Sequence, residues 1–379
     1  KMMQNEIINM AHLGARAFEE IGGEVVQVTA FVQCLSHIGG YKGTYCRLVK
    51  MISQYEKEKG FLGGNNKYIA NQNNFEKIPG MPIVYWIKST VCELYKESLA
   101  KSYMECKSGI MAGSDTYIKN WTEVPSNNIK FDCKSASDMG EYRWFPLNSG
   151  GECRHYYGNN SKVINLWHNG EDIVSNVKNY RLRDQSYYFK RGITWGRIAT
   201  SKIAFREVAD GSLFGDAGPV GFINKSRRYL LGFLCSKVTL YFLEAMNPTM
   251  NYQVHDVENL PVLIESNFHD EVENMVREAI LEEKIDWDSY ETSWDFTSHP
   301  LVKKYVCDTD VTAGPRTISD SYHSWVSECE QRFLGLKANE EELNRIFIDI
   351  YGLQDELDAD VADKDITVHR IFDTKEDIL

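Results

Sequence analysis

Basic and aromatic side chains alternate closely along residues 187–206, which read YYFKRGITWGRIATSKIAFR. Guanidinium and ammonium groups neutralise phosphates and can hydrogen-bond to guanine edges, aromatic rings can stack on extruded bases, and glycine lets a backbone approach a ligand closely. The run therefore predicts contact with a polyanion that carries bases. The alternatives are a solvated sheet face for the basic residues and a core position for the aromatic ones. The candidate residues are Tyr187, Tyr188, Lys190, Arg191, Trp195, Arg197, Lys202 and Arg206.

Two further groups follow this run. Lys225, Arg227 and Arg228 precede an apolar stretch that reads as a helix, and a helix N-terminus favours an anion such as phosphate. Their alternative is to extend into solvent from the first turn. Asn251 and Tyr252 follow the same stretch, and an asparagine amide can bond to both N7 and N6 of adenine. Asn251 could equally serve only as a cap or turn residue.

Two clusters raise the question of a metal. Cys133, Cys153 and His155 offer three ligands at irregular spacing, which is a weak zinc pattern. The loop DWDSYETSWDF at 286–296 carries four carboxylates, which would suit a metal or nuclease site. Its interleaved aromatic residues favour a loop fixed onto a neighbouring element. We therefore predict no metal site.

The net charge of −12 is unevenly distributed. Residues 1–264 carry 31 basic and 25 acidic side chains, whereas residues 265–379 carry 11 basic and 29 acidic ones. Residues 154–228 alone carry 13 basic and 6 acidic side chains. This asymmetry predicts a polyanion-binding body followed by an acidic region that opposes binding.

These candidates need elements to position them. We expect a helix over about 5–18, then a hairpin of two β-rich runs around Gly39-Gly40, a connection over 71–88, and a helix from about Thr90 to Tyr103. Strands and turns should dominate from 109 to 261, apart from one buried helix over Arg228–Met246. Three helices should follow, over Phe268–Lys284, Ser321–Leu336 and Glu340–Tyr351, with a capping box at Asn339 starting the last. The acidic tail at 355–365 should be solvated or only partly ordered.

Composition indicates a folded, multi-domain protein. The chain has 379 residues, 43% apolar and 25% charged, with no run of eighteen apolar residues and no secretory signal pattern. Its nine scattered cysteines form no CxxC pair. We expect a cytoplasmic protein without a membrane partner.

Several stretches together resemble the adenine-specific DNA methyltransferases of bacteriophage-exclusion (BREX) systems, the PglX family, and more distantly the methyltransferases of fused type II restriction-modification enzymes. They are AHLGARAFEEIGGEVVQVTAFV (11–32), NFEKIPGMPIVYW (74–86), RGITWGRIATSKIAFR (191–206), NPTMNYQVHDVENLPV (247–262), DWDSYETSWDF (286–296) and NEEELNRIFIDIYGLQDEL (339–357).

The resemblance implies an α+β chain in three parts: 1–88 as the tail of a methyltransferase core and a connection, 89–264 as a β-rich target-recognition domain with a buried helix, and 265–379 as an acidic helical region. The family needs a glycine-rich turn for S-adenosylmethionine and an Asn/Asp-Pro-Pro-Tyr/Phe loop for the extruded adenine. Asn247-Pro248-Thr249-Met250 lacks the second proline and the aromatic residue, and GGYKGTY lacks the order of a cofactor turn. No catalytic, cofactor-binding or metal residue is therefore assigned here.

The resulting expectation is a C-terminal fragment that recognises double-stranded DNA for a site-specific N6-adenine methyltransferase in phage defence or restriction-modification. S-adenosylmethionine would serve the full-length enzyme, whose catalytic half would lie upstream, and this chain alone should be inactive. The alternative is a non-enzymatic scaffold whose helical region docks other defence proteins. A third alternative is a metal-dependent hydrolase that uses the acidic loop.

Overall fold

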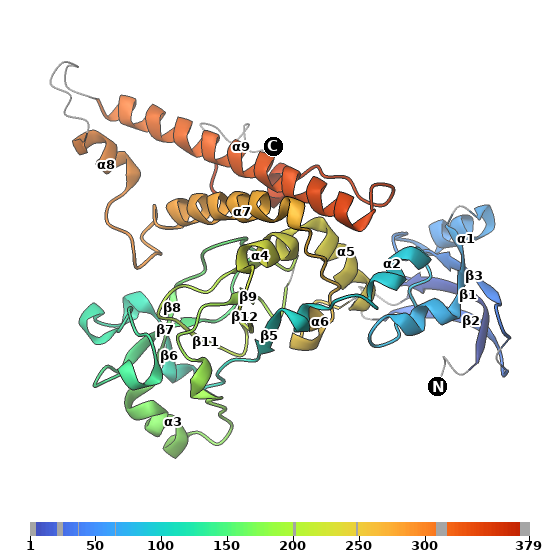
Figure 1. The fold of residues 1–379 in the computed structure, drawn as a ribbon, viewed down its shortest axis with the longest axis horizontal. Helices are drawn as coiled ribbons and strands as arrows, with labels where there is room; N and C mark the ends of the chain where they lie inside the picture. Colours follow the sequence, from blue (N-terminus) through green and yellow to red (C-terminus); the bar gives the residue numbers. More distant parts are fainter. Residues whose placement is uncertain are drawn as a thin grey trace. The chain divides into compact units, whose positions relative to one another are not determined.

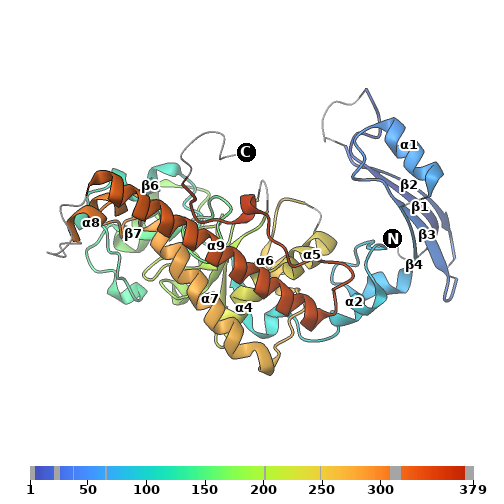
Figure 2. The ribbon, with the colours of Figure 1, turned by 90° about the horizontal axis from the view of Figure 1, so that it is seen from above.

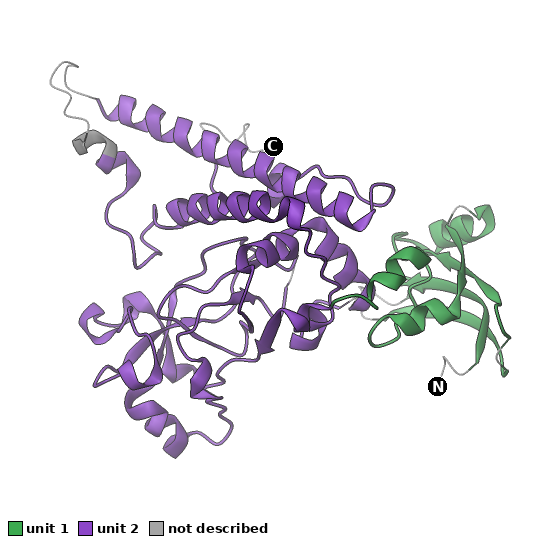
Figure 3. Ribbon diagram, viewed as in Figure 1, with its two compact units in different colours: residues 1–98 green, residues 99–379 purple. Residues whose placement is uncertain are grey.

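A computed structural model describes residues 5–20, 26–36, 38–64, 66–199, 202–247, 249–307 and 317–371, with backbone only at 304–307. The chain divides into two compact units, Lys1–Ser98 and Leu99–Leu379 (Figure 3). Three four-stranded sheets and several helices confirm the predicted α+β class. The assignment of functional segments with boundaries after 88 and 264 stays a prediction.

Unit 1 is built on a sheet in the order β2-β1-β3-β4. The strands are β1 (Glu6–Gly14), β2 (Val28–Cys34), β3 (Lys42–Arg47) and β4 (Lys67–Asn71), with α1 (Gln54–Gly63) between β3 and β4. The predicted helix over 5–18 is wrong, because this stretch forms β1. The predicted hairpin is also wrong, since β1 lies between β2 and β3 and runs parallel to β3. The hydrophobic pattern of a short apolar segment does not distinguish a central strand from a helix. Here the segment is a strand because it pairs with β2 on one side and with β3 on the other.

The helix predicted over 90–103 is shorter in the structure, where α2 spans Ser89–Leu94. The chain beyond Ser98 belongs to unit 2. Leu99 bridges Pro261 there, and the amide of Ala100 donates to the carbonyl of Leu260 at 2.8 Å. These pairings hold Leu99 in an extended form, and a single 3₁₀ turn over Ala100–Ser102 follows it.

Unit 2 contains two sheets, in the orders β10-β9-β12-β5 and β11-β7-β8-β6 (Figure 1). The predicted dominance of strands and turns between 109 and 261 is confirmed. The strands are β5 (Met104–Lys107), β6 (Ile118–Asn120), β7 (Trp144–Asn148), β8 (Lys162–Asn165), β9 (Ile193–Trp195), β10 (Phe205–Glu207), β11 (Leu213–Phe214) and β12 (Val220–Ile223). Two short helices, α3 (Glu171–Asn176) and α6 (Val254–Glu258), lie in the connections.

The predicted buried helix over 228–246 is two helices, α4 (Arg227–Cys235) and α5 (Lys237–Met246), bent by 68°. Ser236 has an extended backbone at the break, and its hydroxyl donates to the carbonyl of Phe233 at 2.7 Å. Asn344 accepts from the amide of Lys237 at 2.8 Å, so a residue far along the chain caps α5. Among the described residues, no single helix is long and apolar enough to cross a bilayer; only the bent α4–α5 pair meets that length and composition.

A helical layer covers α4. Helix α7 (Ser266–Trp287) confirms the predicted amphipathic helix and lies side by side with α9 (Ile318–Tyr351) in both views (Figures 1 and 2). A shorter helix, α8 (Pro300–Cys307), precedes α9. The prediction of two helices over 321–351 is wrong, because α9 is continuous. Asn339, expected to cap the second, instead donates its side-chain amide to the carbonyl of Met275 on α7 at 2.8 Å.

Residues 353–371, here called the C-terminal strap, return across unit 2. The tail within it was expected to be solvated or only partly ordered. The structure instead buries Val361, Ile366 and Val368 of the strap. Several strap carboxylates pair with lysines of unit 2, so the acidic tail at 355–365 is part of the folded body.

Candidate nucleic-acid interface

Strand β9 lies inside its sheet, between β10 and β12. Ile193, Thr194 and Trp195 are all fully buried, so the predicted alternation of one wet and one apolar face is wrong for this strand. The indole of Trp195 donates to the carbonyl of Tyr252 at 3.1 Å. The ring of Tyr188 is also buried, and its hydroxyl donates to the carbonyl of Leu182. In this conformation neither ring can stack on a base.

Arg206 on β10 is buried as well, with 1% of its surface exposed. Its Nη2 group donates to Oδ1 of Asn148 at 3.2 Å and to the carbonyl of Gly150. Burial lowers the pKa of this guanidinium to about 10. Arg206 therefore supports the sheet from within.

The clearest surface feature is a short two-stranded ribbon, residues 197–199 paired with residues 250–252. Ile198 and Asn251 form an antiparallel bridge. The amide of Ala199 donates to Met250 at 3.0 Å, and the amide of Tyr252 donates to Arg197 at 2.7 Å. The structure thus joins two candidate segments that are about fifty residues apart in the sequence.

Cationic side chains surround the ribbon. Arg197 pairs with Asp216, in the turn after β11, and Arg183 reaches the same carboxylate at 3.5 Å. Two guanidinium groups on one carboxylate leave a local positive charge. Lys202 is half exposed and pairs with Asp365 of the C-terminal strap at 2.7 Å. A hollow of about 280 Å³ lies beside the ribbon, lined by Ile198, Ala199, Lys202 and residues 151–153, among others.

A second cationic group lies at Tyr187. The ammonium groups of Lys107 and Lys190 are 5.1 and 5.4 Å from the centre of its ring. A hydrogen bond to Glu105 raises the pKa of the Tyr187 hydroxyl. Arg191 is exposed and binds Asp210 through both arms of its guanidinium. These side chains, unlike Tyr188 and Trp195, are accessible.

Lys225 precedes α4, whereas Arg227 and Arg228 lie in its first turn, and the predicted phosphate site at this helix N-terminus is not open. Lys225 is exposed, Arg227 pairs with Glu207 at 2.9 Å, and Arg228 lies 3.8 Å from Glu273. Glu273 of α7 also accepts from the amide of Tyr229 in the first turn of α4, at 3.1 Å. A carboxylate of the chain itself therefore takes the place in which an anion was expected.

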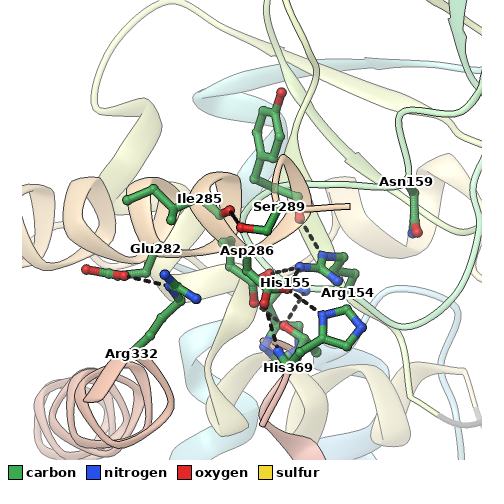
Figure 4. A network of polar contacts seen from close by, with 12 residues as sticks. Arg154, His155, Asn159, Glu282, Ile285, Asp286, Ser289, Arg332 and His369 are labelled. Carbon is green, nitrogen blue, oxygen red and sulfur yellow. Dashed lines mark hydrogen bonds and ion pairs between the residues drawn. The ribbon is translucent and has the colours of Figure 1, made fainter. Parts of the chain in front are cut away.

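A buried ionic network ties the β-rich part of unit 2 to the helical layer and the strap (Figure 4). Nη2 of Arg154 lies 2.5 Å from Asp286 and 3.0 Å from Glu283, both on α7. The backbone amide and the ring of His369 in the strap reach Asp286 at 3.0 and 2.8 Å. Burial raises the pKa of Glu283 to about 8. Burial also acts to raise the pKa of Asp286, but His369 and Arg154 together outweigh it and lower that pKa.

The 286–296 loop confirms the interpretation of an aromatic loop fixed to a neighbour. The indole of Trp121 donates to the carbonyl of Thr292 at 2.9 Å, and the rings of Phe131 and Trp294 lie 5.4 Å apart. Asp288 and Asp295 both bind Lys284, at 2.6 and 2.9 Å. Within the described parts of the chain, no group of three His, Cys, Asp or Glu side chains is arranged to hold a metal ion.

Two residues of this surface escaped the sequence analysis. Arg183 lies just before the run that was singled out, and its left-handed backbone (φ 67°) was not signalled by the sequence. Ile198 was not among the candidate residues of the run, yet 62% of its surface is exposed. Its place on the ribbon follows only from pairing with Asn251.

No protein-family model matches the chain. It is 40% identical to the adenine-specific methyltransferase PglX of Lacticaseibacillus casei (strain Zhang), over 98% of this chain and 32% of that protein. It is also 32% identical to the adenine-specific methyltransferase BrxX of Escherichia coli O9:H4 (strain HS), over 92% of this chain and 28% of that protein. The chain is homologous to these methyltransferases. It spans about a third of the length of these PglX and BrxX proteins.

One structural match is a solved structure of the type IIL restriction-modification enzyme MmeI in complex with DNA. The match covers 93% of this PglX homologue and 44% of the MmeI chain, with a TM-score of 0.46 and 8% sequence identity. A TM-score at this level does not establish a shared fold. The family relationship of this chain rests on its sequence homology to PglX and BrxX.

Proposed function

We propose that this chain is the DNA target-recognition part of a site-specific N6-adenine DNA methyltransferase in a phage-defence or restriction-modification system. The observation that carries the proposal is the exposed ribbon formed by residues 197–199 and 250–252. It presents an amide and an apolar side chain beside Arg197, Arg183 and Lys202. Phosphate contacts from such cations would position a duplex, and the ribbon would then reach base edges. The relatives' names agree with such a substrate.

The methyl transfer itself would use residues outside this chain. S-adenosylmethionine would be the methyl donor of the full-length enzyme. The glycine-rich turn at Gly39-Gly40, which lacks the order of a cofactor turn, leads into strand β3 and not into a helix N-terminus. We therefore expect the catalytic half of the enzyme to be this chain's partner, and the chain alone to be inactive.

The proposal predicts salt-dependent DNA binding that depends on Arg197. With a labelled random-sequence duplex, log affinity should fall linearly with log salt concentration, because phosphate contacts release counterions. Arg197→Ala should weaken binding and lower that slope by about one unit if the guanidinium meets a phosphate. If it meets a guanine instead, the loss should be about 1–3 kcal/mol and confined to some sequences.

Arg345→Ala is the control, since Arg345 on α9 is also a surface arginine paired with a carboxylate, with a side chain 55% exposed against 31% for Arg197. It should leave DNA binding unchanged. Binding by the wild-type chain that is independent of salt would contradict the proposal. So would equal losses for Arg197→Ala and Arg345→Ala.

One observation favours a scaffold as the second candidate. A hollow of about 600 Å³ lies among α7, α8 and α9, and its lining includes the partly exposed apolar residues Leu281, Ile285 and Trp325. Such a surface could receive another protein of the defence system. DNA binding by the isolated chain separates the two candidates, because a pure scaffold would show none.

A further inference from the structure

Ile198 and Asn251 are immediate cross-strand neighbours on the ribbon. The two hydrogen bonds that flank their bridge, from Ala199 to Met250 and from Tyr252 to Arg197, make them a non-hydrogen-bonded antiparallel pair. In such pairs the side chains lie on the same face and closer together than in hydrogen-bonded pairs. Both residues are exposed. An isoleucine and an amide therefore project side by side from this face.

Hydrogen bonds to neighbouring residues hold both the side chain and the backbone of Asn251 in place. Its Oδ1 atom accepts from Nε2 of Gln253 at 2.6 Å. Its backbone amide donates to the hydroxyl of Thr249 at 3.3 Å, and its carbonyl accepts from Asn247 at 2.8 Å. Oδ1 keeps a second lone pair, and among the described residues Nδ2 has no hydrogen-bond partner. The side-chain amide of Asn251 is therefore fixed in position, and its Nδ2 donor and one lone pair of Oδ1 remain available to a ligand.

This pair matches the major-groove edge of one base pair. Adenine presents the N7 acceptor beside the N6 amino donor, and its partner thymine presents a C5-methyl group. Nδ2 of Asn251 can donate to N7 while Oδ1 accepts from N6, and the apolar side chain of Ile198 can contact the methyl group next to them. A two-stranded β-ribbon also fits the width of the major groove.

We propose that Ile198 and Asn251 together read a single A·T base pair, Asn251 at adenine and Ile198 at the thymine methyl group. This inference rests on the proposed DNA-recognition function and adds the base pair and the residues that select it. It explains why a large apolar side chain stays exposed between Arg197 and Lys202, in a run whose other isoleucines are buried.

The test begins with duplexes enriched from a random library by the 379-residue chain. In the enriched sequence, each thymine is replaced in turn by deoxyuridine, which lacks only the C5-methyl group. At one position the replacement should weaken binding of the wild-type chain about fourfold, the effect of one buried methyl group. The same replacement should leave the affinity of Ile198→Ala unchanged, because that variant has already lost the contact with the methyl group.

The second arm replaces the adenine of the same base pair by 7-deazaadenine, which lacks the N7 acceptor. The wild-type chain should lose about tenfold in affinity, and Asn251→Ala should not respond. Leu334→Ala is the matched control: Leu334 is similarly exposed, at 52%, but lies on α9. It should retain the full sensitivity of the wild-type chain to both modified bases.

The outcomes separate the inference from the function on which it rests. A chain that binds no duplex at all refutes the proposed function. A chain that binds DNA but enriches no sequence refutes the base reading alone. The inference also fails if Ile198→Ala is as sensitive to deoxyuridine as the wild-type chain at every position. It fails as well if deoxyuridine and 7-deazaadenine weaken binding at different base pairs.

Discussion

At the scale of single residues, burial separates two kinds of arginine that look alike in the sequence. Arg191 and Arg206 both belong to the basic run, but the first is exposed and the second is enclosed by Asn148 and Gly150. A guanidinium in water can exchange its carboxylate partner for a phosphate. A buried one has hydrogen bonds that nothing else can replace.

Arg206→Ala should therefore destabilise the protein, lowering the free energy of unfolding by about 2–4 kcal/mol, because it leaves a cavity and deprives buried oxygens of their donor. Arg191→Ala should cost less than about 1 kcal/mol, as expected for an exposed ion pair. Urea unfolding followed by tryptophan fluorescence measures both. Equal, small losses would show that the buried guanidinium is not a structural requirement.

At the scale of elements, one glycine controls how α4 meets the helical layer. A Cβ atom at Gly232 would lie 2.9 Å from Cγ2 of Val276 and 3.2 Å from Cγ1 of Val272, both on α7. Those two valines are fully buried. The close approach of α4 to α7, which brings Glu273 to the start of α4, therefore depends on a missing side chain.

Gly232→Val should force the two helices apart and reduce the free energy of unfolding by about 1–3 kcal/mol, the usual cost of overpacking. Gly335, inside α9, is the matched control because a Cβ atom there meets nothing within 4 Å. Gly335→Ala should raise stability by up to about 1 kcal/mol through helix propensity. Thermal unfolding compares the two variants, and a neutral Gly232→Val would contradict the tight packing.

At the scale of the whole molecule, we propose that the acidic region opposes DNA binding through a specific contact. The strap places Asp365 2.7 Å from Lys202, beside the ribbon. Deleting residues 265–379 would not isolate this effect, because α7 and the strap contribute Val272, Val276, Ile366 and Val368 to the core. A single change of charge is the cleaner perturbation.

Asp365→Asn should free Lys202 and raise affinity for a duplex about two- to fivefold at low salt, with a steeper salt dependence of up to about 0.9 units for one added phosphate contact. Asp358→Asn is the control, since it also removes one charge from the strap but releases Lys237 on α5. Fluorescence anisotropy over a salt series measures both. Equal changes in DNA affinity for the two variants would mean that affinity depends on the net charge of the chain and not on the contact between Asp365 and Lys202.

The sequence alone determined the features that depend on local composition. The charge asymmetry, the turn-rich β segment at 109–261, the amphipathic helix at 268–284 and the family motifs are all properties of continuous stretches. The resemblance to adenine-specific methyltransferases is confirmed by relatives that match nearly the whole chain. Such signals do not require knowledge of which segments meet.

The tertiary structure decided what depends on partners distant in the chain. Pairing with β2 and β3 made a strand of residues 6–14, and the side-chain amide of Asn339 joined the continuous α9 to α7. Covering of both faces of β9 buried Ile193, Thr194 and Trp195, whereas Ile198, paired with Asn251 on the ribbon, stayed on the surface. Apolar and basic residues alternate along the run, but only the elements packed on each face of the sheet determine which of them face water.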